Sequence, residues 1–294
     1  MRRLIHKIVN RLGFSLTKIK TKNEEYGLDL YRSLYGEESI QKRRFYNIGA
    51  GGFYHPAWTN IDLQSEWYKG HEEKVKTGIN FDLMSLMPFP VKESTASLVY
   101  SSHTVEHITD AAAENMFKES FRILKDGGIF RLTCPNIDLY YEAYKRNDRH
   151  FFFWINTYTD PVRLAKKKIA KPMDTAPLGE IFLYDFAASV SPLHSDGATQ
   201  RITVEELKTL FQKMKYEEVL NYCTSLCPVD IQKKYPGNHM NWWNLEKAQR
   251  MLKKTGFNKV YASSYGQSFS PVLRDVNFFD KTYPKISLYI EAQK

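Results

Sequence analysis

Short apolar runs separated by longer mixed segments characterise residues 45–133. Each run has the length of a buried strand and ends in a glycine or a polar residue. Five strands are predicted in this way, over residues 45–48, 59–63, 78–81, 96–101 and 129–133. Between the fourth and the fifth, residues 105–124 have helical periodicity. This alternation predicts a parallel α/β sheet, in which ligands bind at the carboxyl edge of the strands.

The second half of the chain has a different pattern. Residues 136–240 are rich in aromatic side chains, as in the run Phe-Phe-Phe-Trp at 151–154, and a basic stretch follows at 163–171. After this segment the strand pattern returns, at 260–264 and 286–291. We therefore expect a helical, aromatic insert, followed by two strands that pair antiparallel and complete the sheet.

The N-terminal segment carries most of the charge. Of a formal net charge of +9, residues 1–22 supply +7, because they hold seven basic and no acidic residues. Leu4, Ile8 and Leu12 fall on one stripe of a predicted helix, with basic residues opposite. Such a helix either lies on an anionic membrane surface, through residues 1–20, or docks on the body. The rest of the chain carries a net charge of only +2. This disfavours a nucleic-acid site, which needs a basic face on the domain itself.

Composition limits the class of protein. The chain has 294 residues, of which 43% are hydrophobic and 14% aromatic, so it can bury a sizeable core. Runs of 18 uninterrupted apolar residues are missing from the sequence, which predicts that no helix spans a membrane. Three cysteines are too few and odd in number for a disulfide framework, which favours a reducing compartment. We expect a cytoplasmic protein, peripheral on the inner membrane face if the N-terminal helix binds lipid.

A glycine turn follows the first predicted strand, and carboxylates end the next two. The turn is Gly-Ala-Gly-Gly at 49–52, and the carboxylates are Asp62 and Asp82. Glycine lets the backbone approach a ligand, and a strand-end carboxylate can accept hydrogen bonds from a ribose diol. A dinucleotide fingerprint needs a third glycine and an acidic residue about 20 positions on. Tyr54 and Lys69 stand at those positions, which disfavours a nicotinamide site.

Five motifs over residues 45–135 occur together in one order. They are Asn-Ile-Gly-Ala-Gly-Gly at 47–52, Asn-Ile-Asp at 60–62, Phe-Asp-Leu at 81–83 with Leu-Met-Pro-Phe at 86–89, Ser-His-Thr-Val-Glu-His at 102–107, and Arg-Ile-Leu-Lys-Asp-Gly-Gly at 122–128. In this order and spacing the chain resembles the class I S-adenosylmethionine-dependent methyltransferases. Its last strand, Ser-Leu-Tyr-Ile-Glu-Ala at 287–292, also resembles that of polysaccharide-cluster methyltransferases. The resemblance implies a Rossmann-like, doubly wound, mostly parallel sheet with an antiparallel final strand.

The resemblance also implies S-adenosyl-L-methionine as cofactor and assigns residues to it. Gly49 and Gly51 would let the backbone meet the methionine and ribose portion. Asp62 would hold the ribose hydroxyls, and Asp82 and Leu83 would face the adenine.

Two further positions border the same predicted site. Ser102, together with His103, would lie beside the sulfonium end of the cofactor. Asn47 stands where the family usually has an acidic residue, so its contact near the methionine amine would be neutral. Only nine residues separate Gly52 from Asp62, and Pro56 is among them, so a loop is expected there instead of the usual helix.

Histidines are the candidates for a general base, because a hydroxyl acceptor needs a base with a pKa near neutrality. His194 and His239, both in the insert, and His103 at the cofactor site are the candidates. His103 and His107 are expected at i and i+4 of one helix. Two histidines without a nearby carboxylate triad are a weak metal signal, so no metal site is predicted.

The insert is expected to bind the acceptor. Several aromatic side chains could stack on sugar or aryl faces, and lysines 166–168 could meet a phosphate. The aromatic candidates are Trp154, Tyr158, Tyr184, Trp242 and Trp243. We expect O-methylation of a sugar in a cell-surface glycan or its lipid- or nucleotide-linked precursor. A small-molecule or nucleic-acid methyltransferase and a catalytically inactive cofactor-binding scaffold remain the alternatives.

The chain is accordingly divided into four parts. They are a basic helical extension (1–44), the cofactor-binding half (45–135), the insert or acceptor lid (136–240) and the C-terminal completion of the sheet (241–294).

Overall fold

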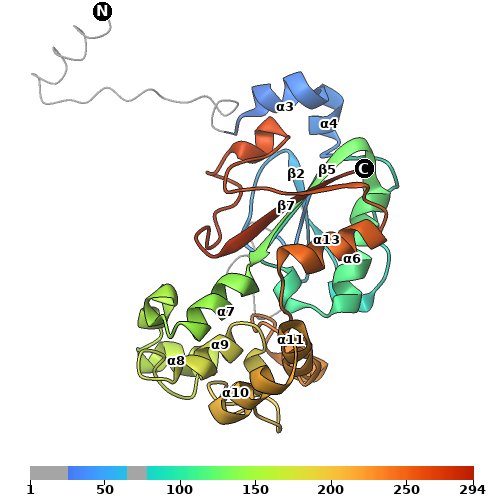
Figure 1. Ribbon diagram of the computed structural model, residues 1–294. Coiled ribbons are helices and arrows are strands. Elements are labelled where there is room, and N and C mark those ends of the chain that lie inside the picture. The colour runs from blue at the N-terminus through green and yellow to red at the C-terminus, as the bar shows by residue number, and fades with distance from the viewer. Residues whose placement is uncertain (1–25, 65–77) are drawn as a thin grey trace, which may run out of the picture.

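Figure 1 shows the computed structural model of the chain, which describes residues 26–64 and 78–294. The basic helix predicted within residues 1–22, with its membrane contact, lies outside the described residues. Within the described ranges, no helix is both long and apolar enough to cross a membrane. The described chain forms a sheet flanked by helices, with a helical lobe at one end of the sheet.

Seven strands form one mixed sheet in the order β3-β2-β1-β4-β5-β7-β6. The strands are β1 Phe45–Ile48, β2 Trp58–Asp62, β3 Ile79–Asn80, β4 Ala96–Ser102, β5 Leu124–Pro135, β6 Lys259–Ala262 and β7 Ser287–Gln293. Neighbours among β1 to β5 pair parallel, whereas β7 runs antiparallel to both β5 and β6. The predicted Rossmann-like α/β fold with an antiparallel final strand is therefore confirmed. The reversed strand lies inside the sheet, because β6 pairs along its outer side.

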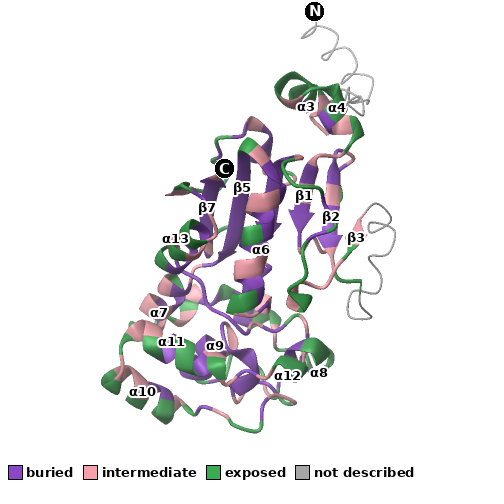
Figure 2. Cartoon of the chain, turned by 90° about the vertical axis from the view of Figure 1, so that its right-hand side faces the viewer, coloured by how far each residue is buried: buried purple, intermediate pink, exposed green. Residues whose placement is uncertain are grey.

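Helices cover both faces of the sheet because its central strands are apolar on both sides. The helices beside the sheet are α3 Leu28–Tyr35, α4 Glu37–Gln41, α6 Asp110–Ile123 and α13 Leu245–Lys254. Successive residues of a strand point to opposite faces. In β4, Val99 packs in the cluster that holds Met116 and Phe117 of α6, while Leu98 and Tyr100 pack in the cluster around α3. Figure 2 shows the central strands largely buried, whereas β3 and β6, at the two edges of the sheet, are partly exposed.

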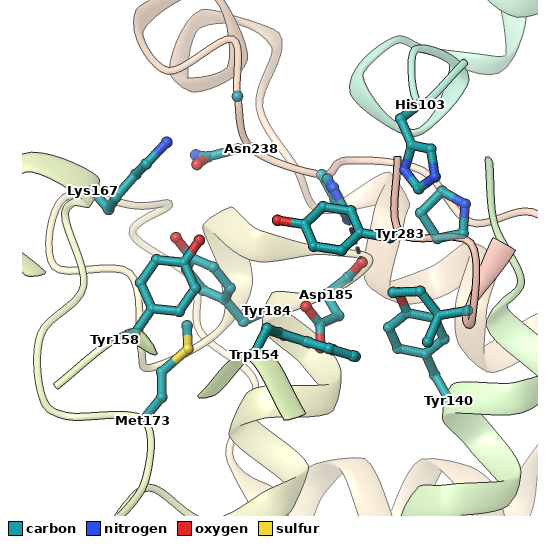
Figure 3. Close-up of a pocket in the computed structure, with 14 residues that line it drawn as sticks. His103, Tyr140, Trp154, Tyr158, Lys167, Met173, Tyr184, Asp185, Asn238 and Tyr283 are labelled. Carbon is teal, nitrogen blue, oxygen red and sulfur yellow. Dashed lines mark hydrogen bonds between the residues drawn. The ribbon is translucent and has the colours of Figure 1, made fainter. Parts of the chain in front are cut away.

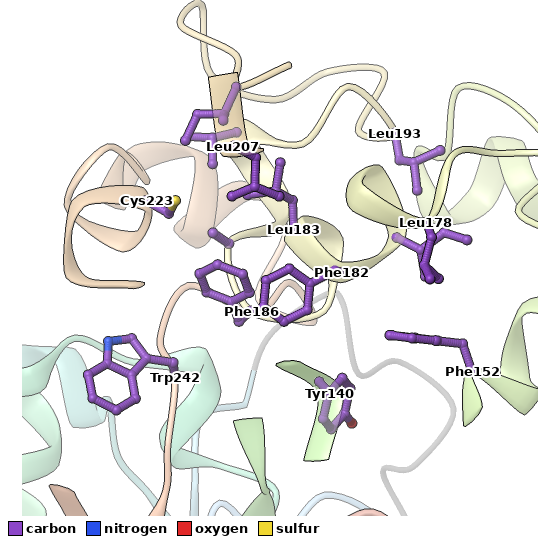
Figure 4. Close-up of a cluster of buried hydrophobic side chains, with 14 of the residues drawn as sticks. Tyr140, Phe152, Leu178, Phe182, Leu183, Phe186, Leu193, Leu207, Cys223 and Trp242 are labelled. Atoms are coloured by element: carbon purple, nitrogen blue, oxygen red, sulfur yellow. The ribbon is translucent and has the colours of Figure 1, made fainter. Parts of the chain in front are cut away.

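A helical lobe follows β5 at the carboxyl end of the parallel strands (Figure 1). Its helices are α7 Ile137–Lys145, α8 Pro161–Lys167, α9 Leu178–Tyr184, α10 Val204–Lys213, α11 Tyr216–Ser225 and α12 Val229–Lys234. The lobe has a hydrophobic core of its own, in which Phe182, Phe186 and Leu207 are fully buried (Figure 4). This core holds the lobe against the edge of the sheet where the glycine turn lies.

The helix predicted over residues 105–124 is broken near its start. The chain makes a 3-10 turn at Val105–His107, and α6 begins only at Asp110, where the Thr109 side chain caps it. His103 precedes the turn with a φ of 52°, in the left-handed region. The prediction that His103 and His107 share one helix is therefore wrong, because Thr109 supplies a stronger helix start than the residues before it.

Candidate active site

The glycine turn after β1 is fixed by close packing on one side and by a carboxylate on the other. Gly49 has a φ of 65°, and a Cβ atom there would lie 2.2 Å from Thr104 Oγ1. Gly51 has a φ of 52°, and a Cβ atom there would meet open space. The Asp62 carboxylate accepts hydrogen bonds from the backbone N–H of Gly51, at 2.6 Å, and of Leu63, at 2.8 Å. The turn therefore exposes its backbone to the cleft while Asp62 ties it to the end of β2.

A cleft of about 770 Å³ opens at this edge of the sheet, between the strand ends and the lobe. Most of the predicted cofactor residues line it, together with two candidate bases, of which His239 is described below. They are Gly49, Gly51, Asp62, Asp82, Leu83, Ser102 and His103. Asn47 is not among the cleft-lining residues that the structure describes. It is buried, and its Oδ1 has no hydrogen-bond partner in the described ranges.

The two strand-end carboxylates have different local roles. Asp82 caps the 3-10 turn Leu83–Ser85, since its Oδ1 accepts the N–H of Met84 at 2.8 Å. Asp62 caps no helix of the described chain. Burial raises the pKa of the Asp62 carboxyl, although the N–H groups of Gly51 and Leu63 oppose that shift. Asp62 is thus a partly desolvated acceptor at the cleft wall, whereas Asp82 also stabilises its own loop.

The cleft fits S-adenosylmethionine in size and in the chemistry of its walls. Ligand sites usually enclose about 300–1,000 Å³, and this cleft has about 770 Å³. The exposed backbone at Gly51 and the carboxylate of Asp62 suit the ribose end of a nucleoside, which presents two hydroxyl donors. The predicted loop between Gly52 and Asp62 is confirmed, since no helix intervenes before β2.

A second, smaller cavity of about 130 Å³ adjoins the cleft (Figure 3). Its walls are mainly aromatic and come from α7, α9 and the loops of the lobe. They include Tyr140, Trp154, Tyr158, Tyr184 and Tyr283. His103, Tyr158, Lys167, Gly237, His239 and Tyr283 line both cavities. These shared residues mark the junction between the cleft and the smaller cavity.

Three of the predicted acceptor aromatics line the smaller cavity, and two do not. Trp154, Tyr158 and Tyr184 line it, whereas Trp242 and Trp243 are 2% and 1% exposed and belong to the hydrophobic cores. Of the predicted phosphate-binding lysines 166–168, Lys167 reaches both cavities, and burial lowers the pKa of its ammonium group.

Asp185 is a wall residue that the sequence analysis missed. Its carboxyl group is buried, and Oδ2 has no hydrogen-bond partner among the described residues. Burial raises the pKa of this carboxyl well above its usual range. A buried polar group without a partner is costly, and such groups are kept where a ligand supplies the partner. The sequence could have indicated this residue, because Asp185 is a single charged residue between two apolar stretches, 181–184 and 186–188.

His239 lies at the junction with one ring nitrogen engaged. Its Nδ1 donates to the backbone carbonyl of Asp185 at 2.6 Å, which puts the proton on Nδ1 and leaves a lone pair on Nε2. Burial, with the nearby His107, lowers the pKa of His239 to about 4. The ring is therefore neutral at neutral pH and can accept a proton at Nε2.

His103 has no lone pair to offer. Its Nδ1 lies 3.0 Å from Glu106 Oε1, and its Nε2 lies 2.8 Å from Ser287 Oγ. The Ser287 hydroxyl gives its single proton to a backbone carbonyl, that of Tyr283 at 2.8 Å or that of Thr282. Both ring nitrogens of His103 are therefore engaged by side chains of the described chain, whereas Nε2 of His239 is not. Burial alone would raise the pKa of Glu106, but His103 lowers it to about 2.

His194 lies away from the site. In the described part of the chain it lines neither cavity, and it is 1% exposed. Its Nδ1 accepts the N–H of Asp196 at 3.2 Å, and its Nε2 lies 2.7 Å from the Asn238 side chain. Burial lowers its pKa to about 4. Of the three candidate bases, the structure thus leaves a free lone pair at the junction only on His239.

Residues 49–132 match the family model described as a methyltransferase domain. No curated protein matches the chain. A similar solved structure is an S-adenosylmethionine-dependent methyltransferase from Mesorhizobium loti, with 10% identity and a TM-score of 0.39, covering 91% of this chain and 96% of that one. Another, from Archaeoglobus fulgidus, has 12% identity and a TM-score of 0.37, covering 92% of this chain and 97% of that one. A phosphoethanolamine N-methyltransferase from Haemonchus contortus, in complex with S-adenosyl-L-methionine, has 13% identity and a TM-score of 0.35, covering 96% of this chain and 62% of that one.

The matched segment runs from the glycine turn to β5 and contains the cofactor cleft's strand ends. Residues 49–132, which include the glycine turn, Asp62, Asp82 and Ser102, are therefore similar to a methyltransferase domain.

Proposed function

We propose that the enzyme methylates a sugar hydroxyl in a cell-surface glycan or in its lipid- or nucleotide-linked precursor. The observation that carries this proposal is the smaller cavity, which joins the cofactor cleft at His239. It combines aromatic side chains with the buried Asp185 carboxyl, whose Oδ2 has no hydrogen-bond partner among the described residues. Aromatic faces pack against the apolar face of a sugar ring, and a carboxyl oxygen accepts a hydrogen bond from a hydroxyl.

Residues of the cleft hold the cofactor in this proposal. The backbone at Gly49 and Gly51 meets its methionine and ribose portion, and Asp62 accepts hydrogen bonds from the ribose hydroxyls. Asp82 and Leu83 face the adenine. When bound, S-adenosylmethionine supplies a methyl group on a positively charged sulfur, which is already a strong electrophile.

Ser102 borders the sulfonium end, next to the junction between the two cavities. Its hydroxyl is paired with Thr133 Oγ1 at 2.8 Å, which holds it at the end of β4. Asn47 is buried in β1 and lines neither cavity of the described chain, so it makes no contact with the cofactor in this proposal. In this proposal the reactive end of the cofactor lies where the acceptor cavity opens.

The lobe binds the acceptor in this proposal. Trp154, Tyr158 and Tyr184 enclose the sugar, and Asp185 orients it through one hydroxyl. Lys167, which reaches both cavities, lies where the phosphate of an activated precursor would enter. Alignment of acceptor oxygen and methyl group supplies much of the rate, because it removes the entropy cost of bringing them together.

His239 accepts the proton of the acceptor hydroxyl at Nε2. The lone pair is oriented by the hydrogen bond from Nδ1 to Asp185, which fixes the tautomer. A base with a pKa of about 4 suffices here. As the new C–O bond forms, the hydroxyl becomes an oxonium, which is a far stronger acid than an alcohol.

Methyl transfer to a panel of acceptors tests the proposal. The panel contains nucleotide sugars, lipid-linked sugars, free sugars and small amines, and mass spectrometry locates the new methyl group. We expect an O-methylated sugar. Methylation of an amine alone would contradict the glycan assignment.

A pair of histidine variants tests the base. His239→Gln is expected to lower kcat by about 100-fold or more, in the range of general-base effects, while affinity for S-adenosylhomocysteine stays within about twofold. His194→Gln is the matched control, because His194 is also buried but lines neither cavity. Full turnover in His239→Gln, with the fold verified by its melting temperature, would remove the histidine base.

We also propose that the basic N-terminal segment brings the enzyme to an anionic membrane surface, where lipid-linked precursors are assembled. Its support is the +7 charge of residues 1–22 with an apolar stripe opposite. Flotation with vesicles containing anionic lipid, compared between the full chain and a chain lacking residues 1–20, measures this. Vesicle binding that survives the deletion contradicts the proposal.

A further inference from the structure

Glu106, His107 and His239 form a cluster at the junction of the two cavities. One carboxylate oxygen and one nitrogen from each imidazole all lie within 4.8 Å of one another. Glu106 and His107 come from the 3-10 turn after β4, and His239 comes from the loop after α12. The backbone carbonyl of Glu106 accepts the N–H of Met240 at 2.8 Å, so the two segments are tied together.

The histidines of this cluster are set up as lone-pair donors. Nδ1 of His107 donates to the backbone carbonyl of Asn238 at 2.8 Å, and Nδ1 of His239 donates to that of Asp185 at 2.6 Å. Each bond places the ring proton on Nδ1 and leaves Nε2 as an acceptor. Histidines that bind metals typically make this second hydrogen bond, which fixes the tautomer and the ring plane.

Glu106 supplies an independent sign of a missing partner. Its side chain is 2% exposed. Oε1 lies 3.0 Å from Nδ1 of His103 in an ion-pair contact, and neither oxygen has a hydrogen-bond partner among the described residues. A buried carboxylate oxygen of this kind carries a desolvation cost that a bound cation would offset. It belongs to the same cluster as the two imidazoles.

We propose that Glu106, His107 and His239 bind a divalent transition-metal ion of the zinc class. Two imidazole nitrogens and one carboxylate oxygen are a donor set of catalytic zinc sites, which keep a fourth position open. Tetrahedral zinc with bonds of about 2.0–2.1 Å places its ligand atoms about 3.4 Å apart. The present span of up to 4.8 Å therefore closes by about 1 Å when the ion binds.

The ion and the proton compete for one lone pair. If Nε2 of His239 holds the ion, it cannot accept the proton of the acceptor hydroxyl, so the ion lowers methyl transfer. This consequence rests on the proposed function, whereas the binding itself does not.

Cobalt titration of the full, tag-free chain, after dialysis against a chelator, measures the binding directly. We expect one Co²⁺ per chain with the visible absorption of a four- or five-coordinate site, displaced by Zn²⁺, and a zinc Kd of about 1 µM or tighter by calorimetry. His107→Ala and His239→Ala should each weaken zinc binding by about 100-fold, because each removes one of three ligands. His150→Ala, which changes an exposed histidine of the lobe, is the matched control.

Two results would overturn the site: no stoichiometric cobalt spectrum in the folded chain, or zinc binding unchanged in both His107→Ala and His239→Ala. Glu106→Gln adds a test of the carboxylate, and because Glu106 is buried its melting temperature is measured alongside. Methyl transfer in the presence of zinc then separates the two proposals. Binding with lowered turnover supports both the site and the base, and binding with raised turnover keeps the site but contradicts proton transfer to His239.

Discussion

The cofactor cleft and the acceptor cavity lie side by side but are built in different ways. The cleft is formed by short segments at the ends of adjacent strands, and its central feature is the backbone of the glycine turn at 49–52. The acceptor cavity is formed by large side chains from the lobe and from the loop before β7. In the proposed function the strand ends of the sheet bind the cofactor, whereas side chains from distant positions of the chain bind the acceptor.

The polar groups of the two sites differ in the same way. Asp62, in the cleft, is satisfied by two backbone N–H groups before any ligand arrives. Asp185, in the acceptor cavity, keeps a buried oxygen without a partner in the described chain. Asp62 therefore stabilises the loop that is proposed to bind the cofactor. The free-energy cost of the buried Asp185 oxygen is offset by the other interactions of the lobe until a ligand binds.

The largest expected effect concerns the cleft. Asp62→Ala removes both the proposed ribose acceptor and the hydrogen bond that holds Gly51. We expect the Kd for S-adenosylhomocysteine to rise by about 100-fold or more, which corresponds to about 2.7 kcal/mol, within the range for hydrogen bonds to charged groups. Calorimetry measures it, with Asp126→Ala, an exposed carboxylate of the turn in β5, as control. An unchanged Kd would remove Asp62 from the cofactor site.

The corresponding change in the acceptor cavity should spare the cofactor. Asp185→Leu is expected to lower kcat/KM for the acceptor by about 10- to 100-fold, with the Kd for S-adenosylhomocysteine within about twofold. The same variant should melt at a higher temperature, because it removes an unpartnered buried carboxyl. Asp174→Leu, which alters an exposed carboxylate of the lobe, is the control. A lower melting temperature together with normal turnover would make Asp185 purely structural.

Alanine substitutions at the two glycines of the turn distinguish the cost of a steric clash from the cost of backbone strain. Gly49 and Gly51 both have left-handed φ values, so alanine at either position costs about 1–2 kcal/mol of backbone strain. Only at Gly49 does the new Cβ also collide with Thr104. We expect Gly49→Ala to lose about 1–3 kcal/mol more in the free energy of unfolding than Gly51→Ala, as measured by urea denaturation. Equal losses would show that the turn tolerates the added methyl group.

Acid should lower the free energy of unfolding, because both regions contain a buried neutral histidine. Burial lowers the pKa of His55, beside the sheet, and of His239, at the acceptor cavity, to about 4 each. Below about pH 6.5 the unfolded histidines take up protons that the folded ones do not, so stability is lost as the pH falls from 6.5 toward 4. Each ring should contribute about 1–2 kcal/mol of this loss between pH 7 and pH 5. Urea denaturation of His55→Gln and His239→Gln across this range measures the two shares, and a loss that neither variant reduces contradicts this origin.

The difference between the two sites also explains how far the sequence could be interpreted. The strand ends were predictable because each strand is a local apolar run, and parallel strands bring their carboxyl ends to one edge. Gly49, Asp62 and Ser102 therefore lie in one cleft, as the motif order suggested. Their roles toward the cofactor stay predictions, because only the placement is described. The family match covers this half of the molecule and stops at residue 132.

The acceptor cavity was harder to predict because its contacts are distant in sequence. Glu106 and His239 are 133 positions apart, and no local pattern indicates that their side chains meet. Likewise, His194 and His239 lie in similar polar loops, and only the packing of the lobe places one at the junction and the other away from it. The early break in the helix after β4 had a local signal in Thr109, which outweighs the helical periodicity before it.

Cofactor binding in the glycine-turn cleft is the claim on which the acceptor and base proposals both build. Calorimetric titration of the full chain with S-adenosylhomocysteine is the decisive measurement. We predict one binding site per chain with a measurable heat, and the same site competed by S-adenosylmethionine. The titration extends to about 1 mM, because a Kd of that size corresponds to a binding free energy of only about −4 kcal/mol. A folded chain that gives no heat with either compound in this range would contradict cofactor binding in the cleft.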